Sequence, residues 1–468
     1  MEAILARQKR ANDAKGPPTA QVRRDRLTRC INLLLTHKDE LVAAVQADFG
    51  ARSRDMTLLT DIAAAIGPLK QARAQLEEWM KPRSRKVSPA ALGVLGAKAE
   101  VRYQPKGVVG VMTPWNFPVQ LALDAIAGAF AAGNRVMLKP SEFTPQTSAL
   151  LAQLFDLYFD EEEIAVVLGG ADVGAAFAAL PFDHLIFTGA TSVGRHVMRA
   201  AADNLTPVTL ELGGKSPVIV GRSADMAKTA ARVMAGKTMN AGQICLAPDY
   251  VLAPKENVGA FVEAAKAATE KMFPTLKDNE QYTAIINQRH YDRVRGLIAD
   301  AQAKGAQIIE INPAKEDFSQ QEHRKIPPTL IVGATDDMSV MQEEIFGPVL
   351  PIRAYDAVEE TIAYVNAHPR PLALYYFGED AAESEALLTR TTSGGVTIND
   401  VIFHFTMDDL PFGGVGASGI GAYHGRRGFF EFSHEKAVYR QTGSELLAMM
   451  RPPYGDAFRK QVAARLKP

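Results

Sequence analysis

The sequence is poor in cysteine, and this scarcity excludes several classes of protein. Two cysteines in 468 residues cannot form the disulfide framework on which small secreted domains depend. Cys245 has no partner at metal-ligand spacing, and a CxxC pair is absent. We therefore expect a reduced protein without a metal site.

A charge excess and long apolar runs are missing as well. The net charge is -1 and the isoelectric point is about 6.8, so neither a basic surface for nucleic acid nor a polyacidic tail is indicated. We find no signal peptide at the start and no apolar run of membrane-spanning length. We expect a cytoplasmic protein with two or three domains, and with neither a nucleic acid nor a membrane as its partner.

The first eighty residues have the pattern of helices. Leu27, Cys30, Ile31 and Leu34 repeat at helical spacing, which predicts a core position for Cys30. Further helices are expected up to Gly50 and over 56–79. Residues 81–104 contain prolines and glycines followed by an extended rhythm, which predicts a protruding hairpin that needs a neighbour to pack on.

The hydrophobic period changes after Lys106 to short apolar runs separated by helical segments. Strands are expected at 108–112, 135–138, 164–168, 184–187 and 208–210. Such alternation predicts a doubly wound parallel sheet, which binds ligands at the carboxyl ends of its strands. A second α/β domain follows Lys215, and its helix over 225–239 leads to Cys245. Near the end, an edge strand over 437–441 and a short amphipathic helix within 451–468 are expected.

Three separate segments contain the side chains that acyl-thioester chemistry needs. Cys245 offers a nucleophile, Glu211 a carboxylate base and Asn116 an amide donor. Each also has a plainer interpretation: a buried thiol, a strand-end glutamate facing solvent, and a turn asparagine. No histidine stands at an obvious pairing position, so the group that activates the thiol stays open.

Several motifs occur in an order that resembles a known family. They are Pro-Trp-Asn116-Phe-Pro, Lys139-Pro-Ser-Glu, the Gly189/Gly194 loop, Glu211-Leu-Gly-Gly-Lys, Gly-Gln-Ile-Cys245, Glu344-Ile-Phe-Gly-Pro and Pro411-Phe-Gly-Gly. With them the chain resembles an aldehyde dehydrogenase over essentially its whole length. The lack of a long amino-terminal extension is similar to the short, dimeric class. Residues 245–250 and 408–416 look most like the branch that oxidises coniferyl aldehyde.

The resemblance implies a fold and a catalytic cycle. The expected fold is α/β: a Rossmann-like cofactor domain (1–84 and 104–212) and a catalytic domain (213–418), both doubly wound parallel sheets. A small β oligomerisation arm (85–103 and 436–445) and a return and tail (419–468) complete it. Cys245 would attack the aldehyde, and Asn116 with the Cys245 backbone N–H would hold the oxyanion. After hydride transfer to nicotinamide, Glu211 would activate the water that hydrolyses the thioester.

The resemblance also assigns cofactor residues, and NAD is expected, with NADP possible. Gly189, Ser192 and Gly194 would form the dinucleotide loop, although GxGxxG is absent and an ordinary tight turn is the alternative. Lys139 and Glu142 would bind the ribose, where a carboxylate repels the extra phosphate of NADP. The remaining expected cofactor contacts are Thr113, Pro114, Trp115 and Leu212, with Glu344 at the nicotinamide ribose and Phe346 packed beside it.

The expected substrate is an aromatic or cinnamyl-type aldehyde, coniferaldehyde first. The apolar loop from Ile402 to Met407 precedes Pro411 and suits a hydrophobic aldehyde, while His404 within it is expected to be a surface residue without a role. Three alternatives stay open: a medium- or long-chain aliphatic aldehyde dehydrogenase, an enzyme that transfers the acyl group to coenzyme A, and an inactive binding protein. A homodimer is expected, with residues 101–103 and 437–441 at its interface.

Overall fold

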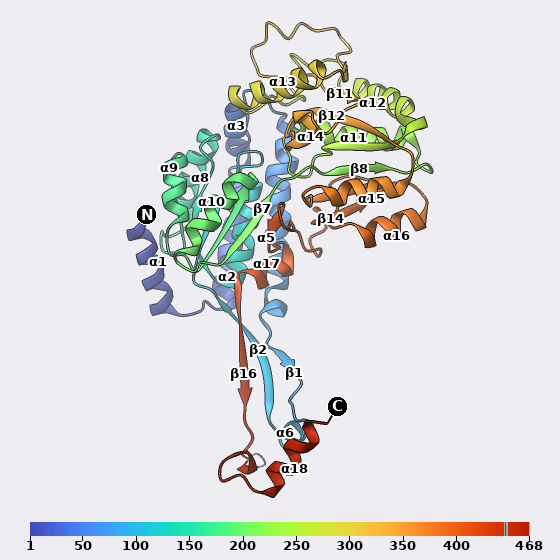
Figure 1. The fold of residues 1–468 in the computed structure, drawn as a ribbon. Coiled ribbons are helices and arrows are strands. Elements are labelled where there is room, and N and C mark those ends of the chain that lie inside the picture. The colour runs from blue at the N-terminus through green and yellow to red at the C-terminus, as the bar shows by residue number, and fades with distance from the viewer. Residues whose placement is uncertain (444, 446–447, 468) are drawn as a thin grey trace.

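The structure is a computed structural model that describes residues 1–443, 445 and 448–467. Two sheets, each covered by helices, form the body, and a third sheet projects from the body as an arm (Figure 1). Residues 444, 446, 447 and 468 lie outside the described residues. They belong to the predicted segments 436–445 and 419–468, so those two predictions extend beyond what the structure describes.

The amino-terminal region is helical, as the periodicity predicts. The helices are α1 (Glu2–Lys15), α2 (Ala20–Thr36), α3 (Lys38–Phe49), α4 (Arg54–Thr57) and α5 (Ala64–Met80), with a π-helical turn at Leu58–Ala63 between the last two. Cys30 is fully buried on α2, and burial raises the pKa of its thiol. Its predicted core position is confirmed.

The first sheet has the strand order β15-β7-β6-β3-β4-β5. The β3 to β7 strands are parallel, and α7 is buried along its whole length against them. The two-residue β15 is antiparallel to β7, with Gly419 opposite Glu211, so one edge departs from the predicted parallel arrangement. The bounds are β3 Val108–Met112, α7 Gln120–Ala132, β4 Arg135–Lys139, α8 Pro145–Tyr158, β5 Ile164–Val166, α9 Ala171–Ala178, β6 His184–Gly189, α10 Thr191–Ala202, β7 Val208–Leu212 and β15 Gly419–Ile420.

The second sheet has the strand order β10-β11-β12-β9-β8-β13-β14. All of its pairs are parallel except β10 with β11, so the departure is again at an edge. The bounds are β8 Pro217–Val220, α11 Met226–Thr238, β9 Tyr250–Pro254, α12 Val258–Met272, α13 Gln288–Ala303, β10 Gln307–Glu310, β11 Thr329–Val332, α14 Ser339–Gln342, β12 Val349–Tyr355, α15 Val358–Ala367, β13 Ala373–Phe377, α16 Ala381–Arg390 and β14 Gly395–Ile398.

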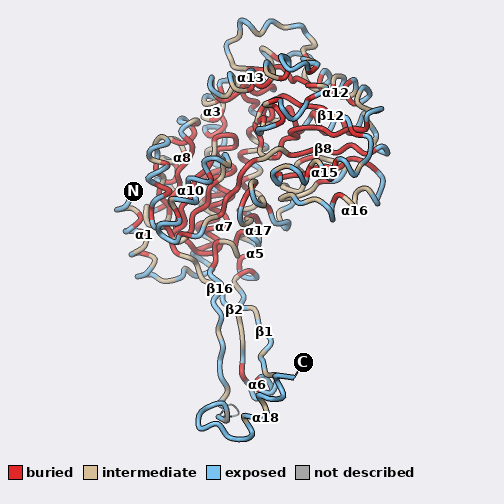
Figure 2. Tube along the Cα trace, viewed as in Figure 1, coloured by how far each residue is buried: buried red, intermediate tan, exposed pale blue. Residues whose placement is uncertain are grey.

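The arm consists of the strands β1 (Arg83–Arg85), β2 (Lys98–Pro105) and β16 (Ser433–Arg440). Strands β1 and β2 pair antiparallel, which confirms the predicted hairpin. Strand β16 pairs with β2 along its full length and forms an edge of the sheet over 433–440, where the sequence predicted an edge strand over 437–441. The arm carries α6 (Ala90–Val94) and α18 (Asp456–Arg465) at its far end, and α17 (Gly425–Glu431) precedes β16 at its base. Figure 2 shows that most of the arm is exposed or half-buried, and Val94 is 88% exposed.

The fold gathers the predicted site residues along one edge of the first sheet. Lys139 ends β4, Gly189 ends β6 and Leu212 ends β7, while Thr113 directly follows β3. In a doubly wound sheet this carboxyl edge is where ligands bind. The chain then crosses through Gly213 and Gly214 to β8 of the second sheet, so the edge faces the other half of the body.

Candidate active site

The Cys245 loop follows α11 and has an unusual backbone. A 3-10 turn spans Met239–Gly242, and Asn240, Ala241 and Gly242 have φ angles of 48°, 52° and 73°. Such left-handed conformations are costly for residues other than glycine and persist where the surroundings impose them. At Gly242 a Cβ would lie 2.3 Å from the Gly347 carbonyl oxygen, so only glycine fits there.

The fully buried side chain of Gln243 fixes this loop. Its Nε2 donates to the Asn240 carbonyl at 2.9 Å and to the Ala284 carbonyl at 3.1 Å, and its Oε1 accepts from the Ile286 N–H at 3.0 Å. Both N–H groups and the oxygen of this amide therefore form hydrogen bonds inside the protein. The position of Cys245, two residues further on, follows from this anchor.

Asn116 is held directly against the same loop. Its Nδ2 donates to the Gln243 carbonyl at 3.1 Å, and Asn240 Nδ2 donates to the Asn116 carbonyl at 3.1 Å. An amide nitrogen carries two hydrogens, so one N–H of Asn116 remains for a second acceptor. The side chain is 3% exposed, and the structure thus brings the predicted amide donor and the predicted nucleophile together.

A buried ion pair fixes the backbone carbonyl of Asn116. Arg52 donates to the Asn116 carbonyl at 2.7 Å and pairs with Asp61 at 2.6 Å, and both charged side chains are fully buried. Asp61 also accepts from the Val119 N–H at 3.1 Å. The sequence analysis missed this pair. Its sequence signal is weak, because nothing in the local pattern distinguishes Arg52 or Asp61 from surface charges.

Glu211 is a buried carboxylate near the end of β7. It is 2% exposed, and neither of its carboxyl oxygens has a hydrogen-bond partner within the described residues. Burial, and then the charge of Glu431, raises its pKa well above the usual value. The solvent-facing interpretation is therefore wrong. A buried unpartnered carboxyl group is costly for stability and marks a functional position.

The Cys245 thiol is half-buried and faces carboxylates. Burial, and then the charges of Glu344 and Glu211, raises its pKa to about 12. The thiol is therefore protonated at neutral pH in this structure. The buried Tyr423, which the sequence analysis missed, also faces the site, since the charges of Glu211 and Cys245 act on its hydroxyl.

Lys139 and Glu142 form a polar pair at the end of β4. Lys139 Nζ lies 3.1 Å from Glu142 Oε2 and donates to the Pro140 carbonyl at 3.1 Å, and its side chain is buried. Beside it, the Thr113 N–H donates to the Lys139 carbonyl at 3.1 Å, and the buried Thr113 Oγ1 has no partner among the described residues. Pro114 is half-buried next to Thr113, and Trp115 is buried.

The Gly189 loop allows the backbone to come close to a ligand. A Cβ at Gly189 would lie 2.7 Å from the Phe187 ring, and one at Gly194 would lie 2.7 Å from the Leu212 side chain. Ser192 is exposed in the first turn of α10. A helix amino terminus attracts a phosphate through its free N–H groups. The loop is thus suited to a pyrophosphate even without GxGxxG.

Glu344 and Phe346 lie at the junction of the two halves. A Cβ on Gly213 would lie 2.1 Å from Glu344 Oε2, and the buried Glu344 Oε1 has no partner in the described part of the chain. Burial, and then the charge of Asp249, raises the pKa of Glu344 to about 8. The Phe346 ring packs edge-on against Trp115 at 5.4 Å. A buried carboxyl oxygen without a hydrogen-bond partner, beside a glycine that has no side chain, fits a polar cofactor.

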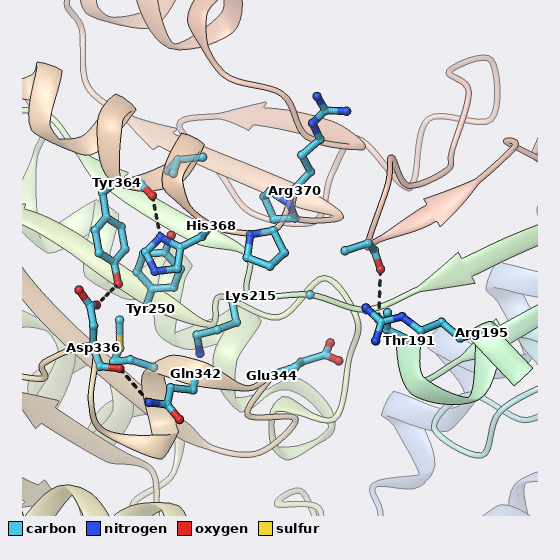
Figure 3. A pocket seen from close by; sticks show the side chains of 17 residues that line it. Thr191, Arg195, Lys215, Tyr250, Asp336, Gln342, Glu344, Tyr364, His368 and Arg370 are labelled. Atoms are coloured by element: carbon cyan, nitrogen blue, oxygen red, sulfur yellow. Dashed lines mark hydrogen bonds between the residues drawn. The ribbon is translucent and has the colours of Figure 1, made fainter.

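Glu344 is one of the residues that line a cavity of about 370 Å³, and Figure 3 shows the side chains around it. Gly213 and Gly214 line it, as do the basic residues Arg195 and Lys215, which the sequence analysis missed. Lys215 donates to the Val340 carbonyl at 2.7 Å. The residues that line it include Glu344 but none of the three predicted catalytic residues.

The apolar loop before Pro411 is partly exposed, but its histidine is not a surface residue. Phe403 and Met407 are 53% and 47% exposed, whereas His404 is half-buried and bonds Thr397 Oγ1 through Nδ1 at 2.8 Å. Burial lowers the pKa of His404 to about 4. The prediction of a surface histidine was wrong, because its burial depends on β14, which the local sequence does not show.

Residues 1–443, 445 and 448–467 contain neither a metal-binding cluster of side chains nor a helix suited to cross a membrane. No group of three or more His, Cys, Asp or Glu side chains is arranged to hold a metal ion there. None of the described helices is long and apolar enough to cross a membrane.

Comparison with known proteins places the chain in a family. The model of the aldehyde dehydrogenase family matches residues 1–438. The chain is similar to a probable coniferyl aldehyde dehydrogenase of Caulobacter vibrioides, with 63% identity over 100% of this chain and 97% of that protein.

Solved structures agree with this assignment. The substrate-bound state of Staphylococcus aureus AldH has a TM-score of 0.93 and 34% identity, over 100% of this chain and 99% of that one. A Mycobacterium tuberculosis aldehyde dehydrogenase complexed with NAD+ has a TM-score of 0.84 and 30% identity, over 94% and 90%. The order of motifs, the geometry around Cys245 and these similarities lead to one conclusion: the chain belongs to the aldehyde dehydrogenase family.

Proposed function

We propose that this enzyme oxidises an aromatic aldehyde of the cinnamyl type, coniferaldehyde first, to its carboxylic acid with NAD as the cofactor. The observation that carries the proposal is the meeting of three groups from distant segments. Asn116 is bonded to the loop of Cys245 at 3.1 Å, and the buried Glu211 carboxyl acts electrostatically on the same thiol. These are a donor, a nucleophile and a base around one reacting carbon.

The first half of the reaction forms the bond between enzyme and substrate. Cys245 attacks the aldehyde carbon as a thiolate, so the proton must leave the thiol, whose pKa is about 12, before the bond forms. The free N–H of Asn116 and the backbone N–H of Cys245 stabilise the developing oxyanion. NAD would supply the hydride acceptor at this site, and loss of the hydride from the aldehyde carbon would leave the acyl group on Cys245 as a thioester.

The second half hydrolyses that thioester. Glu211 removes a proton from water while the water oxygen adds to the thioester carbon. Collapse of the tetrahedral intermediate breaks the carbon–sulfur bond and releases the acid. The raised pKa of Glu211 makes its carboxylate a stronger base than an exposed one, and its lack of a hydrogen-bond partner among the described residues leaves both oxygens available to water.

The cofactor assignment rests on the carboxyl edge of the first sheet. Lys139 and Glu142 would bind the adenine-side ribose, and the Glu142 carboxylate disfavours the additional phosphate of NADP by like-charge repulsion. Gly189, Ser192 and Gly194 would cradle the pyrophosphate. Thr113, Pro114, Trp115 and Leu212 would complete the contacts, with Glu344 at the nicotinamide ribose and Phe346 beside it.

The substrate assignment has two supports. One relative with 63% identity is named a probable coniferyl aldehyde dehydrogenase. The loop before Pro411 presents exposed apolar side chains at Phe403 and Met407, which suit an aromatic aldehyde more than a small polar one. Aliphatic aldehydes and transfer to coenzyme A are the competing outcomes.

We further propose a cytoplasmic homodimer that is held through the arm. The arm leaves apolar side chains such as Val94 and Tyr439 exposed, and a narrow three-stranded sheet needs a partner to pack on. The division into a cofactor domain (1–84 and 104–212), a catalytic domain (213–418), an arm (85–103 and 436–445) and a tail (419–468) is part of the same proposal.

A substrate panel tests the proposal. The enzyme is mixed with NAD or NADP and with coniferaldehyde, benzaldehyde, hexanal or dodecanal, and reduced cofactor is followed by absorbance. Coniferaldehyde with NAD should give the highest kcat/KM and a free acid product. A higher kcat/KM for an aliphatic aldehyde would overturn the substrate class, and an acyl-coenzyme A product on addition of coenzyme A would overturn hydrolysis.

A further inference from the structure

A chain of hydrogen bonds crosses the first sheet between a surface groove and the neighbourhood of Glu211. Lys106 Nζ lies 2.9 Å from His184 Nδ1, His184 Nε2 lies 2.8 Å from Thr209 Oγ1, and Thr209 Oγ1 donates to Glu431 Oε1 at 2.7 Å. Lys106 lines an open groove of about 510 Å³ at the base of the arm. This chain of hydrogen bonds thus joins β6, β7 and α17.

The donors in this chain all point toward Glu431. His184 is 1% exposed, and burial, with the charge of Lys106, lowers its pKa to about 3, so its imidazole is neutral. An ammonium group can only donate, so Nδ1 accepts from Lys106 and the Nε2–H donates to Thr209. Thr209 then donates to Glu431 Oε1, which is the acceptor at the end of this hydrogen-bond chain.

Glu431 lies beside the proposed general base. Thr209 and Glu211 are two residues apart on β7, so their side chains share one face of the sheet, roughly 7 Å apart. Gly421 makes room for the Glu431 carboxylate, since a Cβ there would lie 2.6 Å from Glu431 Oε1. The charge of Glu431 also acts on Glu211 on one side and on Lys106 on the other.

The other oxygen of Glu431 faces outward. Glu431 Oε2 lies 3.5 Å from Arg427 Nη2, and the Glu431 side chain is 14% exposed while that of Arg427 is 53% exposed. One carboxylate therefore has its Oε1 fixed within the sheet and its Oε2 near solvent. Glu211 is buried, so it has no carboxyl oxygen near solvent through which a proton could leave.

We infer that Glu431 receives the proton that Glu211 takes from the hydrolytic water and passes it to solvent, while Lys106, His184 and Thr209 hold it in position. This inference rests on the proposed role of Glu211. Glu431 touches neither substrate nor cofactor and is a proton-transfer and positioning residue.

The balance of the step needs no further reactant. The water O–H bond breaks, its proton goes to Glu211 and its oxygen bonds the thioester carbon. When the carbon–sulfur bond breaks, its electron pair returns to Cys245. The proton on Glu211 then moves to Glu431 through a bridging water and leaves to solvent. The charged or titratable groups that face Glu211 are Cys245, Tyr423 and Glu431, and Arg427 and Lys106 face Glu431.

The test compares Glu431→Gln with wild type in the full-length enzyme at several buffer concentrations. The first burst of reduced cofactor should keep its amplitude, because acylation does not use this outlet. Steady-state turnover in dilute buffer should fall at least about tenfold, which is less than the roughly 100-fold or more that a group transferring a proton in the transition state contributes, because Glu431 does not contact the substrate. Adding imidazole or phosphate, which can take the proton instead, should restore turnover toward the wild-type rate.

Two further variants sharpen the test. Thr209→Val cuts the chain but keeps the carboxylate, and it should show a smaller loss with the same buffer dependence. Glu435→Gln removes an exposed carboxylate on β16, opposite Tyr103 in the arm, and should match wild type at every buffer concentration. If Glu431→Gln does not fold, Thr209→Val decides: a buffer-dependent loss supports the inference, and no such loss overturns it.

Several outcomes would overturn the inference. Wild-type turnover of Glu431→Gln in dilute buffer would do so, as would a loss that no buffer restores, which indicates a structural role only. Glu211→Gln is assayed in parallel. Full turnover in that variant would refute the proposed function of Glu211 itself, whereas a stalled Glu211→Gln beside an unchanged Glu431→Gln would refute only the proton outlet.

Discussion

Replacing Asn116 with alanine removes the proposed oxyanion donor and tests the geometry around Cys245. Loss of one such donor typically costs about 2.7–4 kcal/mol of transition-state stabilisation, which is about 10²- to 10³-fold in kcat. The cost in folding should be small, about 1 kcal/mol. The reason is that the Gln243 carbonyl, which Asn116 bonds at 3.1 Å, also accepts from Asn240 at 3.2 Å, so the substitution leaves no buried acceptor unpaired.

Asn240→Gly is the matched control for Asn116→Ala. It removes an amide from the same hydrogen-bond cluster, and glycine tolerates the φ of 48° at that position. We expect a similar small loss of thermal stability and a fall in kcat of less than about tenfold, since Asn240 donates to backbone carbonyls and not to the substrate. Stopped-flow measurement of reduced cofactor gives kcat for both. The reasoning fails if Asn116→Ala keeps kcat within threefold of wild type, or if Asn240→Gly is equally impaired.

The remaining predictions concern the thiol and the ion pair. Cys245→Ala should bind NAD, as measured by quenching of protein fluorescence, but should form no reduced cofactor; any sustained turnover would argue against Cys245 as the nucleophile. The pKa of the Cys245 thiol is about 12, and only the thiolate reacts with iodoacetamide. The rate of alkylation in the cofactor-free enzyme should therefore rise about tenfold per pH unit between pH 7 and 9. A rate that does not change with pH would show that the thiol is already ionised. Asp61→Asn leaves the buried Arg52 charge unpaired and should cost about 3–5 kcal/mol in urea unfolding, whereas Glu78→Gln, at an exposed pair with Lys81, should leave the midpoint unchanged. Equal midpoints for the two variants would contradict the account.

The strand–helix alternation could be predicted because the strands of a parallel sheet are buried on both faces. Val108–Met112 and Arg135–Lys139 are buried at every position, and such runs stand out between helical periods. The orientation of the edge strands could not be predicted. Strand β15 has two residues and pairs with β7, more than 200 residues earlier in the chain, and β10 gives no local sign that it is antiparallel.

The positions of Cys245, Asn116 and Glu211 were predicted from motifs, and their environment was not. The hydrogen bonds that fix Asn116 connect it to Arg52 and Gln243, 64 and 127 residues away. Side-chain pairing at such separations follows no sequence period. Burial of Glu211 is also a tertiary property, since a strand end can face either solvent or a neighbouring element.

His404 and Glu431 are two further residues whose surroundings could not be predicted from the local sequence. His404 is a titratable residue within an apolar loop, and the sequence predicts a surface position for it, yet its ring forms a hydrogen bond with Thr397 on β14. Glu431 ends a short helix near the arm and has the pattern of a surface charge. Only the fold brings it next to Thr209, 222 residues earlier in the chain.

The claim that Glu211 activates the water after Cys245 is acylated has a direct measurement. Glu211→Gln is mixed rapidly with NAD and coniferaldehyde, and reduced cofactor is followed against the concentration of active sites. The account predicts one equivalent formed in a burst, followed by a stall with the acyl group retained on Cys245 and visible by mass spectrometry. Continued turnover at the wild-type rate, without an acyl adduct, would contradict it.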